Sequence, residues 1–380
     1  MDISVDGLTL RYGDSVAVRE LSLTISEGES VVLLGQSGCG KTSTMRCIAG
    51  LETPSAGRIR IGDEVLFDAA KGVNRPPHKR NIGMVFQSYA IWPHMTVLEN
   101  VAFPLTMQRV SKSDVKRRAV ETLELVGLGD FADRGASQLS GGQMQRVALA
   151  RSLAMQPSVM LLDEPLSNLD ARLRHRLRGD LRELQTRLGL TSVYVTHDQE
   201  EALALADRIA MMQQGRIVQI SAPDEIYARP VSASVADFLG VGNILPVEPV
   251  DATGVRVAGT AVTLRVPEYA RDRELRACIR SEDMALGDDV APGMQTVEGR
   301  LLAREFLGAT ATYRIAIGEG VELQVMGGKH RQLQGRPGDA VRVGVPVEAV
   351  QVLPVDVVHP GDQAPQDLPR ESHDHDRVVA

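Results

Sequence analysis

Cysteine is scarce in this chain of 380 residues, and the apolar runs are short. The three cysteines, Cys39, Cys47 and Cys278, form neither a CxxC pair nor an even set, so the sequence disfavours both a disulfide framework and a zinc site. The longest apolar runs, such as 31–34 and 159–162, fall well short of the roughly 18 residues that a bilayer-spanning helix needs. The N-terminus also lacks a basic region followed by an apolar stretch. We therefore expect free thiols, no membrane-spanning segment and a cytoplasmic location.

Positive charge is not in excess either. The chain has 42 Lys and Arg against 49 Asp and Glu, a net charge of −7, and this balance argues against a generally basic nucleic-acid binder. Hydrophobic residues make up 43% and charged residues 24%, as in ordinary soluble globular proteins. The 35 glycines and 19 prolines are too few for a disordered chain. At about 150 residues per domain, the length predicts two or three domains.

The hydrophobic pattern changes along the chain. Up to about residue 235, short β-rich runs alternate with helical stretches, which is typical of a mixed sheet covered by helices. From about residue 240, period-two alternation with Gly-rich turns predicts a small β-barrel. Residues 359–380 are polar, contain proline and lack a pattern, so we expect them to be disordered.

A helix predicted over 171–188 carries six arginines, which taken alone would suggest a surface for nucleic acid or membrane. Its leucines, however, recur at helical spacing and form one apolar stripe. Because the whole chain is acidic, we interpret the arginines as the solvated face of an amphipathic helix.

A glycine-rich loop lies between a predicted strand at 31–34 and a helix that should stop at Gly50. Its sequence fits GxxxxGK[ST], in which backbone N–H groups close around phosphates, Lys41 reaches the β- and γ-phosphates and the Thr42 hydroxyl binds Mg²⁺. We therefore expect ATP and Mg²⁺ as cofactors. The predicted nucleotide-binding residues of this loop are Gly35, Gln36, Ser37, Gly38, Cys39, Gly40, Lys41 and Thr42.

The apolar run 159–162 ends in two acids, Asp163 and Glu164. This pattern predicts a buried strand that delivers both carboxylates to the edge of the sheet. Asp163 would hold Mg²⁺ and Glu164 would act on water. Because nucleotide binding alone does not need the second acid, the pair favours hydrolysis.

The sequence LSGGQ at 139–143 opens a second helix whose start could bind phosphate. Together with the glycine-rich loop it resembles the ATP-binding cassette family, whose signature is this sequence. The resemblance implies that two copies close head to tail around two ATP molecules. Ser140, Gly142 and Gln143 of one copy would then contact the γ-phosphate held by Lys41 of the other.

Further markers of the family follow in the same order. Gln87 resembles the Q-loop residue, which links Mg²⁺ to the segment that receives a membrane subunit. Residues 167–170 look like the D-loop, whose Asp170 we count among the nucleotide-binding residues. His197 looks like the switch histidine that contacts the γ-phosphate, and Tyr12 resembles the aromatic that stacks on adenine. The implied catalytic residues are Glu164, His197 and Gln87, and the implied Mg²⁺ ligands are Thr42, Gln87 and Asp163.

The resemblance also implies the domains. We expect an α/β P-loop NTPase cassette at 1–235, with a RecA-like core and a helical subdomain. A small all-β, OB-like TOBE barrel would follow at 236–358, similar to that of maltose, polyamine and ferric-iron importers, and the disordered tail would cover 359–380. The implied function is ATP hydrolysis that drives import of a small solute. The chain would lie on the cytoplasmic face of the inner membrane as a homodimer, bound to integral-membrane permease subunits and served indirectly by a solute-binding protein, with no nucleic-acid partner.

The substrate leans one way only. Segments 88–97 and 238–245 look more like ferric-iron and polyamine importers than sugar importers. A sugar or phosphonate importer of the same group stays open, as do an ABC-type mechanoenzyme acting on nucleic acid or ribosomes and a nonenzymatic regulatory binder. One P-loop, no heptad run and a β-rich second domain favour transport over the mechanoenzyme, and the two acids at 163 and 164 favour an enzyme.

Overall fold

The computed structural model describes residues 1–267, 269–270, 273–328 and 335–357. The chain divides into two compact units, the first made of residues 1–231 and 235–240, the second of residues 232–234 and those from 241 onward. The predicted tail at 359–380 lies outside the described residues. None of the helices within the described ranges is long and apolar enough to cross a membrane.

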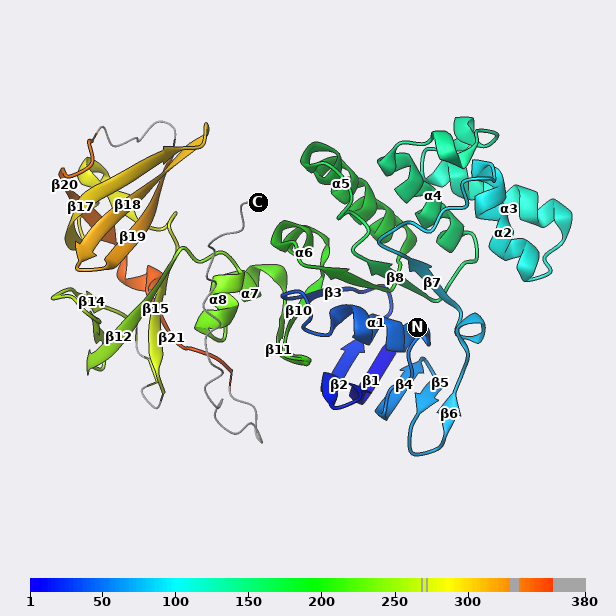
Figure 1. The fold of residues 1–380 in the computed structure, drawn as a ribbon, viewed down its shortest axis with the longest axis horizontal. Helices are drawn as coiled ribbons and strands as arrows, with labels where there is room; N and C mark the ends of the chain where they lie inside the picture. Colours follow the sequence, from blue (N-terminus) through cyan, green and yellow to red (C-terminus); the bar gives the residue numbers. More distant parts are fainter. Residues whose placement is uncertain (268, 271–272, 329–334, 358–380) are drawn as a thin grey trace, which may run out of the picture. The chain divides into compact units, whose positions relative to one another are not determined.

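A mostly parallel sheet forms the centre of the first unit (Figure 1). Its order is β11-β10-β3-β9-β8-β7; every neighbouring pair is parallel except the antiparallel β10 and β11. The strands are β3 (Ser30–Leu34), β7 (Ile82–Val85), β8 (Val159–Asp163), β9 (Ser192–Thr196), β10 (Arg208–Gln213) and β11 (Arg216–Ser221). The apolar runs at 31–34 and 159–162 thus form buried central strands, as predicted.

A second, antiparallel sheet of this unit has the order β2-β1-β4-β5-β6. Its strands are β1 (Ile3–Tyr12), β2 (Ser15–Ile25), β4 (Ala56–Ile61), β5 (Glu64–Asp68) and β6 (Val73–Asn74). The helices of the unit are α1 (Lys41–Ala49), α2 (Val97–Met107), α3 (Lys112–Leu125), α4 (Gly141–Leu153), α5 (Ala171–Leu188), α6 (Gln199–Leu205) and α7 (Pro223–Ala228). A further helix, α8 (Ala233–Phe238), spans the division between the units. Figure 1 shows α2, α3 and α4 gathered beside one another, as expected for a helical subdomain; α2 and α3 lie between the P-loop and the signature, and α4 begins within the signature.

Two hydrophobic cores lie on opposite faces of the parallel sheet. Along β3, Val31 and Leu33 pack into the core shared with α1 and the antiparallel sheet, whereas Val32 and Leu34 pack into the core beneath the other helices. Successive side chains of a strand point to opposite faces, so a strand covered on both sides reads as a continuous apolar run. This double burial fixes the height at which the strands end, and their ends carry the site.

The second unit is β-rich and has one core of its own between two five-stranded sheets. One sheet has the order β14-β13-β12-β15-β21 and the other β16-β20-β17-β18-β19. The strands are β12 (Asn243–Asp251), β13 (Gly254–Val257), β14 (Thr263–Arg265), β15 (Leu275–Ile279), β16 (Ala285–Leu286), β17 (Gln295–Phe306), β18 (Thr310–Gly318), β19 (Val321–Gly328), β20 (Ala340–Val345) and β21 (Gln351–Pro354). The period-two segments of the sequence are therefore strands.

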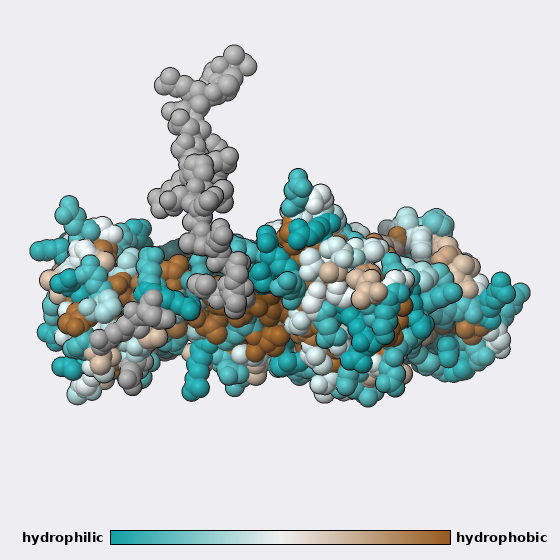
Figure 2. Space-filling model, turned by 90° about the horizontal axis from the view of Figure 1, so that it is seen from below, coloured by the Kyte–Doolittle hydropathy of each residue, from teal (hydrophilic) through white to brown (hydrophobic). Residues whose placement is uncertain are grey.

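Polar and charged residues are spread over the face seen in Figure 2, interrupted by smaller apolar areas.

The leucine stripe of α5 is largely buried, through Leu177, Leu181 and Leu184. The interpretation of the α5 arginines as a solvated face is wrong for Arg174, Arg178 and Arg182, which pair with acids in or beside α6. The first two pairs are considered below.

The end of α1 depends on a buried arginine. Gly50 ends the helix in the left-handed conformation, as predicted, with φ 78°. The Arg80 side chain, in a residue only 1% exposed, donates from Nη1 to the carbonyl oxygens of Cys47 and Ile48 at 2.8 Å each. A Cβ at Gly50 would lie 2.4 Å from Arg80 Nε, so the glycine also makes room for this guanidinium. The Cys47 carbonyl also accepts the Gly50 N–H at 3.1 Å, so Arg80 adds a second donor there and satisfies the Ile48 carbonyl.

Replacing this arginine should destabilise the first unit. In Arg80→Met the Ile48 carbonyl loses its side-chain donor, while the Cys47 carbonyl keeps the Gly50 N–H, at a cost of about 1–3 kcal/mol. Calorimetry should show a lower unfolding midpoint for the corresponding transition. The matched control is Arg19→Met, at an exposed arginine, which should change stability by less than about 0.5 kcal/mol. Equal midpoints for the two variants would contradict this role of Arg80.

Candidate functional site

The carboxyl ends of β3, β8 and β9 meet at one edge of the parallel sheet. Leu34 pairs with Thr196, and Asp163 pairs with Val195, so the three strands end at the same level. The P-loop follows β3, Glu164 follows β8 and His197 follows β9. Residues separated by more than 150 positions in the sequence are thereby brought to one edge, which is where ligands bind in open α/β sheets.

The P-loop wraps the start of α1. Gln36, Ser37 and Gly38 lie exposed at its tip, while Cys39 and Lys41 are buried. Gly40 has φ 102°, and a Cβ there would lie 2.5 Å from the carbonyl oxygen of Ala17, so no other residue fits without a shift of the backbone.

Lys41 is folded back on its own loop. Its ammonium donates to the carbonyl oxygens of Gly35 at 2.7 Å and Gln36 at 2.8 Å, and lies 3.7 Å from the Cys39 Sγ. The Lys41 ammonium, which the sequence predicts to bind phosphate, thus lies against the backbone of the P-loop.

Thr42 and Asp163, both predicted metal ligands, lie together. The Thr42 hydroxyl donates to Asp163 Oδ1 at 3.1 Å. Burial raises the pKa of Asp163, more than the Thr42 hydrogen bond and the nearby Arg46 lower it. A buried carboxylate beside a hydroxyl is an oxygen donor set that suits a hard divalent cation.

Glu164 lies between two other predicted residues. Its Oε1 is 3.1 Å from His197 Nδ1, and its Oε2 accepts a hydrogen bond from Gln87 Nε2 at 3.2 Å. Its backbone has φ 43°, an uncommon conformation for a residue other than glycine. Such backbone strain collects at functional sites, where the surroundings hold it in place. The structure thus brings together all three residues predicted to be catalytic.

The D-loop adds contacts that the sequence did not predict. The Gln87 amide also lies 3.3 Å from Ser167 Oγ, and Asn168 Nδ2 donates to the Gln87 backbone carbonyl at 2.8 Å. The segment after Gln87 is fixed by Arg151 of α4, which donates to the carbonyl oxygens of Tyr89 and Ala90. The signal that could have revealed this contact is the presence of a charged residue, Arg151, at a buried position late in the signature helix.

The remaining predicted residues lie at helix starts and a hairpin. Ser140 and Gln143 form a reciprocal capping box at the start of α4, and the Asp170 carboxylate caps α5 by accepting from the Leu173 N–H at 3.0 Å. A Cβ at Gly142 would come within 3.1 Å of Leu173, so this glycine allows α4 to approach α5 closely.

The Tyr12 side chain is available for stacking. Its residue is 52% exposed at the end of β1, and its hydroxyl donates to Glu52. Burial and this hydrogen bond raise the pKa of Tyr12.

Two family models match parts of this chain. The ABC transporter family matches residues 18–167, and the TOBE domain family matches residues 277–353. An Fe(3+) ions import ATP-binding protein of Brucella suis is 46% identical over 318 residues, covering 82% of this chain and 87% of the relative. The chain belongs to the ABC transporter family. A trehalose/maltose import ATP-binding protein of Thermococcus litoralis is 53% identical over 229 residues, covering 60% of this chain and 62% of that protein.

Solved structures give the same fold for the cassette. A dimeric ATP-binding cassette in a post-hydrolysis state, bound to ADP and phosphate, matches with a TM-score of 0.50 and 32% identity, covering 58% of this chain and 98% of that one. A subunit of an ABC transporter complex from Clostridium perfringens matches with a TM-score of 0.54 and 29% identity, covering 60% and 90%. This ABC protein is therefore an ATP-binding ATPase with a C-terminal TOBE domain.

The thiol in the P-loop of this ABC protein gives a test of the site. Cys39 is 6% exposed, and burial raises its pKa despite the opposing effect of Lys41. Because the thiolate is the reactive form, N-ethylmaleimide should inactivate ATP hydrolysis slowly at neutral pH and faster as the pH rises. ATP should slow the inactivation, and Cys39→Ala should resist it. Inactivation that is equally fast in Cys39→Ala, or indifferent to ATP, would place the reactive thiol elsewhere.

Proposed function

We propose that this chain is the ATP-hydrolysing subunit of an importer whose membrane permeases are separate chains, and that the imported solute is ferric iron. The observation that carries the hydrolytic part is the position of Glu164, next to Asp163 at the sheet edge and between Gln87 and His197. The solute rests on the import proteins to which the chain is similar.

Glu164 is the general base in this proposal. A carboxylate within hydrogen-bond reach of the attacking water accepts its proton as the bond to the γ-phosphorus forms. The His197 ring, 3.1 Å from the carboxylate, holds it on one side and faces the phosphate; the Gln87 amide, at 3.2 Å, holds it on the other. Lys41 exchanges the carbonyl oxygens of its own loop for the β- and γ-phosphates. Tyr12 stacks on the adenine ring of ATP. The other P-loop residues supply backbone N–H groups.

The oxygen set at this edge fits Mg²⁺. Thr42 and Asp163 would hold the ion from two elements, with Gln87 as the third ligand, and burial, which raises the pKa of Asp163, leaves a carboxylate that a cation would stabilise. Bound there, Mg²⁺ neutralises the charge that develops on the phosphate oxygens.

Two copies complete the proposed enzyme. Ser140 and Gln143 cap α4 in their own chain, and in the proposal they and Gly142 contact the γ-phosphate held by Lys41 of the second copy, with Asp170 near the same junction. The similar cassette bound to ADP and phosphate is dimeric, which supports this arrangement. The homodimer would bind integral-membrane permeases on the cytoplasmic face of the inner membrane, as a peripheral subunit supplied by a solute-binding protein.

Sugar import is the second candidate for the solute. It is favoured by the relative named as a trehalose/maltose import protein, which is 53% identical within the aligned 229 residues. That alignment covers 60% of this chain, whereas the Fe(3+) import relative covers 82% and so extends further into the second unit. The longer match favours iron.

The general-base assignment predicts the behaviour of Glu164→Gln. The amide cannot accept the proton, so ATP turnover should fall by about 10²- to 10⁴-fold while ATP binding is retained. Steady-state phosphate release and a titration with a fluorescent ATP analogue measure the two properties. The control is Glu200→Gln, at an exposed glutamate of α6, which should keep normal turnover. Undiminished turnover in Glu164→Gln would refute the assignment.

The importer assignment predicts which proteins accompany this chain. Tagged Glu164→Gln protein, purified with ATP from detergent-solubilised native membranes, should carry polytopic permease subunits. The solute-binding protein of that complex should then be titrated with ferric iron, maltose and polyamines. It should bind ferric iron and neither of the other two kinds of solute. Maltose binding would establish the second candidate instead. Recovery of ribosomes or nucleic acid would overturn the importer assignment.

A further inference from the structure

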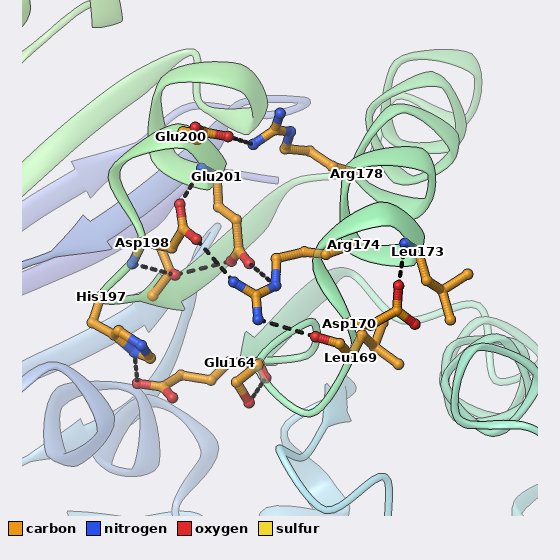
Figure 3. Close-up of polar contacts among 12 residues, drawn as sticks. Glu164, Leu169, Asp170, Leu173, Arg174, Arg178, His197, Asp198, Glu200 and Glu201 are labelled. Atoms are coloured by element: carbon orange, nitrogen blue, oxygen red, sulfur yellow. Dashed lines mark hydrogen bonds and ion pairs between the residues drawn. The ribbon is translucent and has the colours of Figure 1, made fainter. Parts of the chain in front are cut away.

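Arg174 of α5 connects the D-loop to the segment that carries His197 (Figure 3). It lies one turn after the Asp170 cap of its helix. Its Nη2 donates to the backbone carbonyl of Leu169 in the D-loop at 3.1 Å, and its Nη1 donates to Asp198 Oδ2 at 3.2 Å. One planar guanidinium thus contacts two segments that each adjoin the candidate site.

The two contacts fall next to functional positions. Leu169 immediately precedes Asp170, whose carboxylate caps α5. Asp198 immediately follows His197, and its other carboxylate oxygen caps α6 by accepting from the Glu201 N–H at 3.1 Å. Arg174 therefore joins the segments at the starts of two helices.

A buried carboxylate completes this network next to the residues that flank His197. Glu201 is 2% exposed and accepts hydrogen bonds from Tyr194 Oη at 2.8 Å and Thr196 Oγ1 at 2.9 Å. The same Thr196 hydroxyl accepts from the Asp198 N–H at 2.9 Å, so the residues on both sides of His197 are fixed. The Glu201 Oε1 also lies 3.9 Å from Arg174 Nε, about 1 Å beyond the usual length of a hydrogen bond.

A neighbouring arginine provides the contrast. Arg178, one turn further along α5, pairs with Glu200 of α6 at 3.1 Å. The Glu200 side chain is 80% exposed and the Arg178 side chain 14%, so the acid of this pair lies at the surface. Arg178 thus joins the same two helices without contacting the D-loop or the residue beside His197, which makes it a matched control for Arg174.

We propose that Arg174 is a positioning residue for ATP hydrolysis, which sets the place of His197 by tying Asp198 to the D-loop carbonyl of Leu169. It rests on the function proposed above, since it acts through His197 and contacts no nucleotide. The need for two acceptors at fixed angles explains an arginine here, because the forked guanidinium presents parallel donors that a lysine ammonium cannot.

The test compares kcat and KM in three variants of the full chain. Arg174→Ala should lower kcat for ATP about tenfold or more and change KM by less than about threefold, because the contact positions a group that acts after the nucleotide is bound. Arg174→Lys keeps the charge and loses the fork, so its kcat should fall severalfold. Arg178→Ala should stay within about twofold of the parent chain.

A double-mutant cycle tests whether Arg174 acts through His197. In a His197→Ala background, measured by single-turnover hydrolysis of labelled ATP, adding Arg174→Ala should cause little further loss, since coupled residues are not additive. If the two losses multiply instead, Arg174 does not act through His197 and the proposal is overturned.

Other outcomes also decide the matter. A kcat within twofold of the parent in Arg174→Ala would overturn the proposal. Equal losses of kcat in Arg174→Ala and Arg178→Ala, with equal falls in unfolding midpoint, would also overturn it, because they would show a merely structural role. If Arg174→Ala does not fold, parent-like kcat in Arg174→Lys is the contradicting result. Glu164→Gln separates the two levels: unchanged turnover there removes the proposed function, whereas an inactive Glu164→Gln with an unaffected Arg174→Ala removes only the positioning role.

Discussion

The parallel register of β3, β9 and β8 is the constraint on which the rest of the first unit depends. These strands are buried on both faces, so a slip of one residue would turn every apolar side chain toward the wrong core. With the register fixed, the loops after Leu34, Asp163 and Thr196 leave the sheet at one level. The hydrophobic cores thereby set the spacing of the polar groups at the edge, although none of the core residues takes part in chemistry.

Above that edge, the polar groups are held mainly by one another. Glu164 contacts Gln87 and His197, the Gln87 backbone is tied to the D-loop by Asn168, and the D-loop is tied to Asp198 by Arg174. The loops after β7, β8 and β9 therefore form a closed circuit of hydrogen bonds.

Much of the site could be predicted from the sequence because its residues belong to local motifs. The strand, glycine-rich loop and helix around Lys41 are contiguous, and so are the buried run and the acids at Asp163 and Glu164. The positions of Gln87 and His197 came from a family resemblance, and the structure brings both to Glu164. The alternation beyond residue 240 identified strands because each has one buried face.

The rest depended on contacts between distant parts of the chain. Arg174 and Asp198 are 24 residues apart, and the arginines of α5 looked alike in the helical pattern, so nothing local separated the paired ones from the solvated ones. Arg80 pairs with carbonyls 32 and 33 residues before it. Such contacts follow from packing angles between elements, which composition and periodicity do not specify. The partner surface of Ser140 lies in another copy in our proposal, and one chain cannot display it.

The hydrogen bonds of Lys41 have a thermodynamic consequence. Its ammonium is bound to the carbonyl oxygens of Gly35 and Gln36, which occupy it as phosphate oxygens would. In the proposed function, nucleotide binding exchanges these carbonyl oxygens for phosphate oxygens, so the affinity would be the difference between two sets of bonds. The same bonds fix the loop to its own lysine, so little chain entropy would be lost on nucleotide binding in the proposed function. The carbonyl oxygens of Gly35 and Gln36 thus take the positions on the Lys41 ammonium that phosphate oxygens would take in the proposed function.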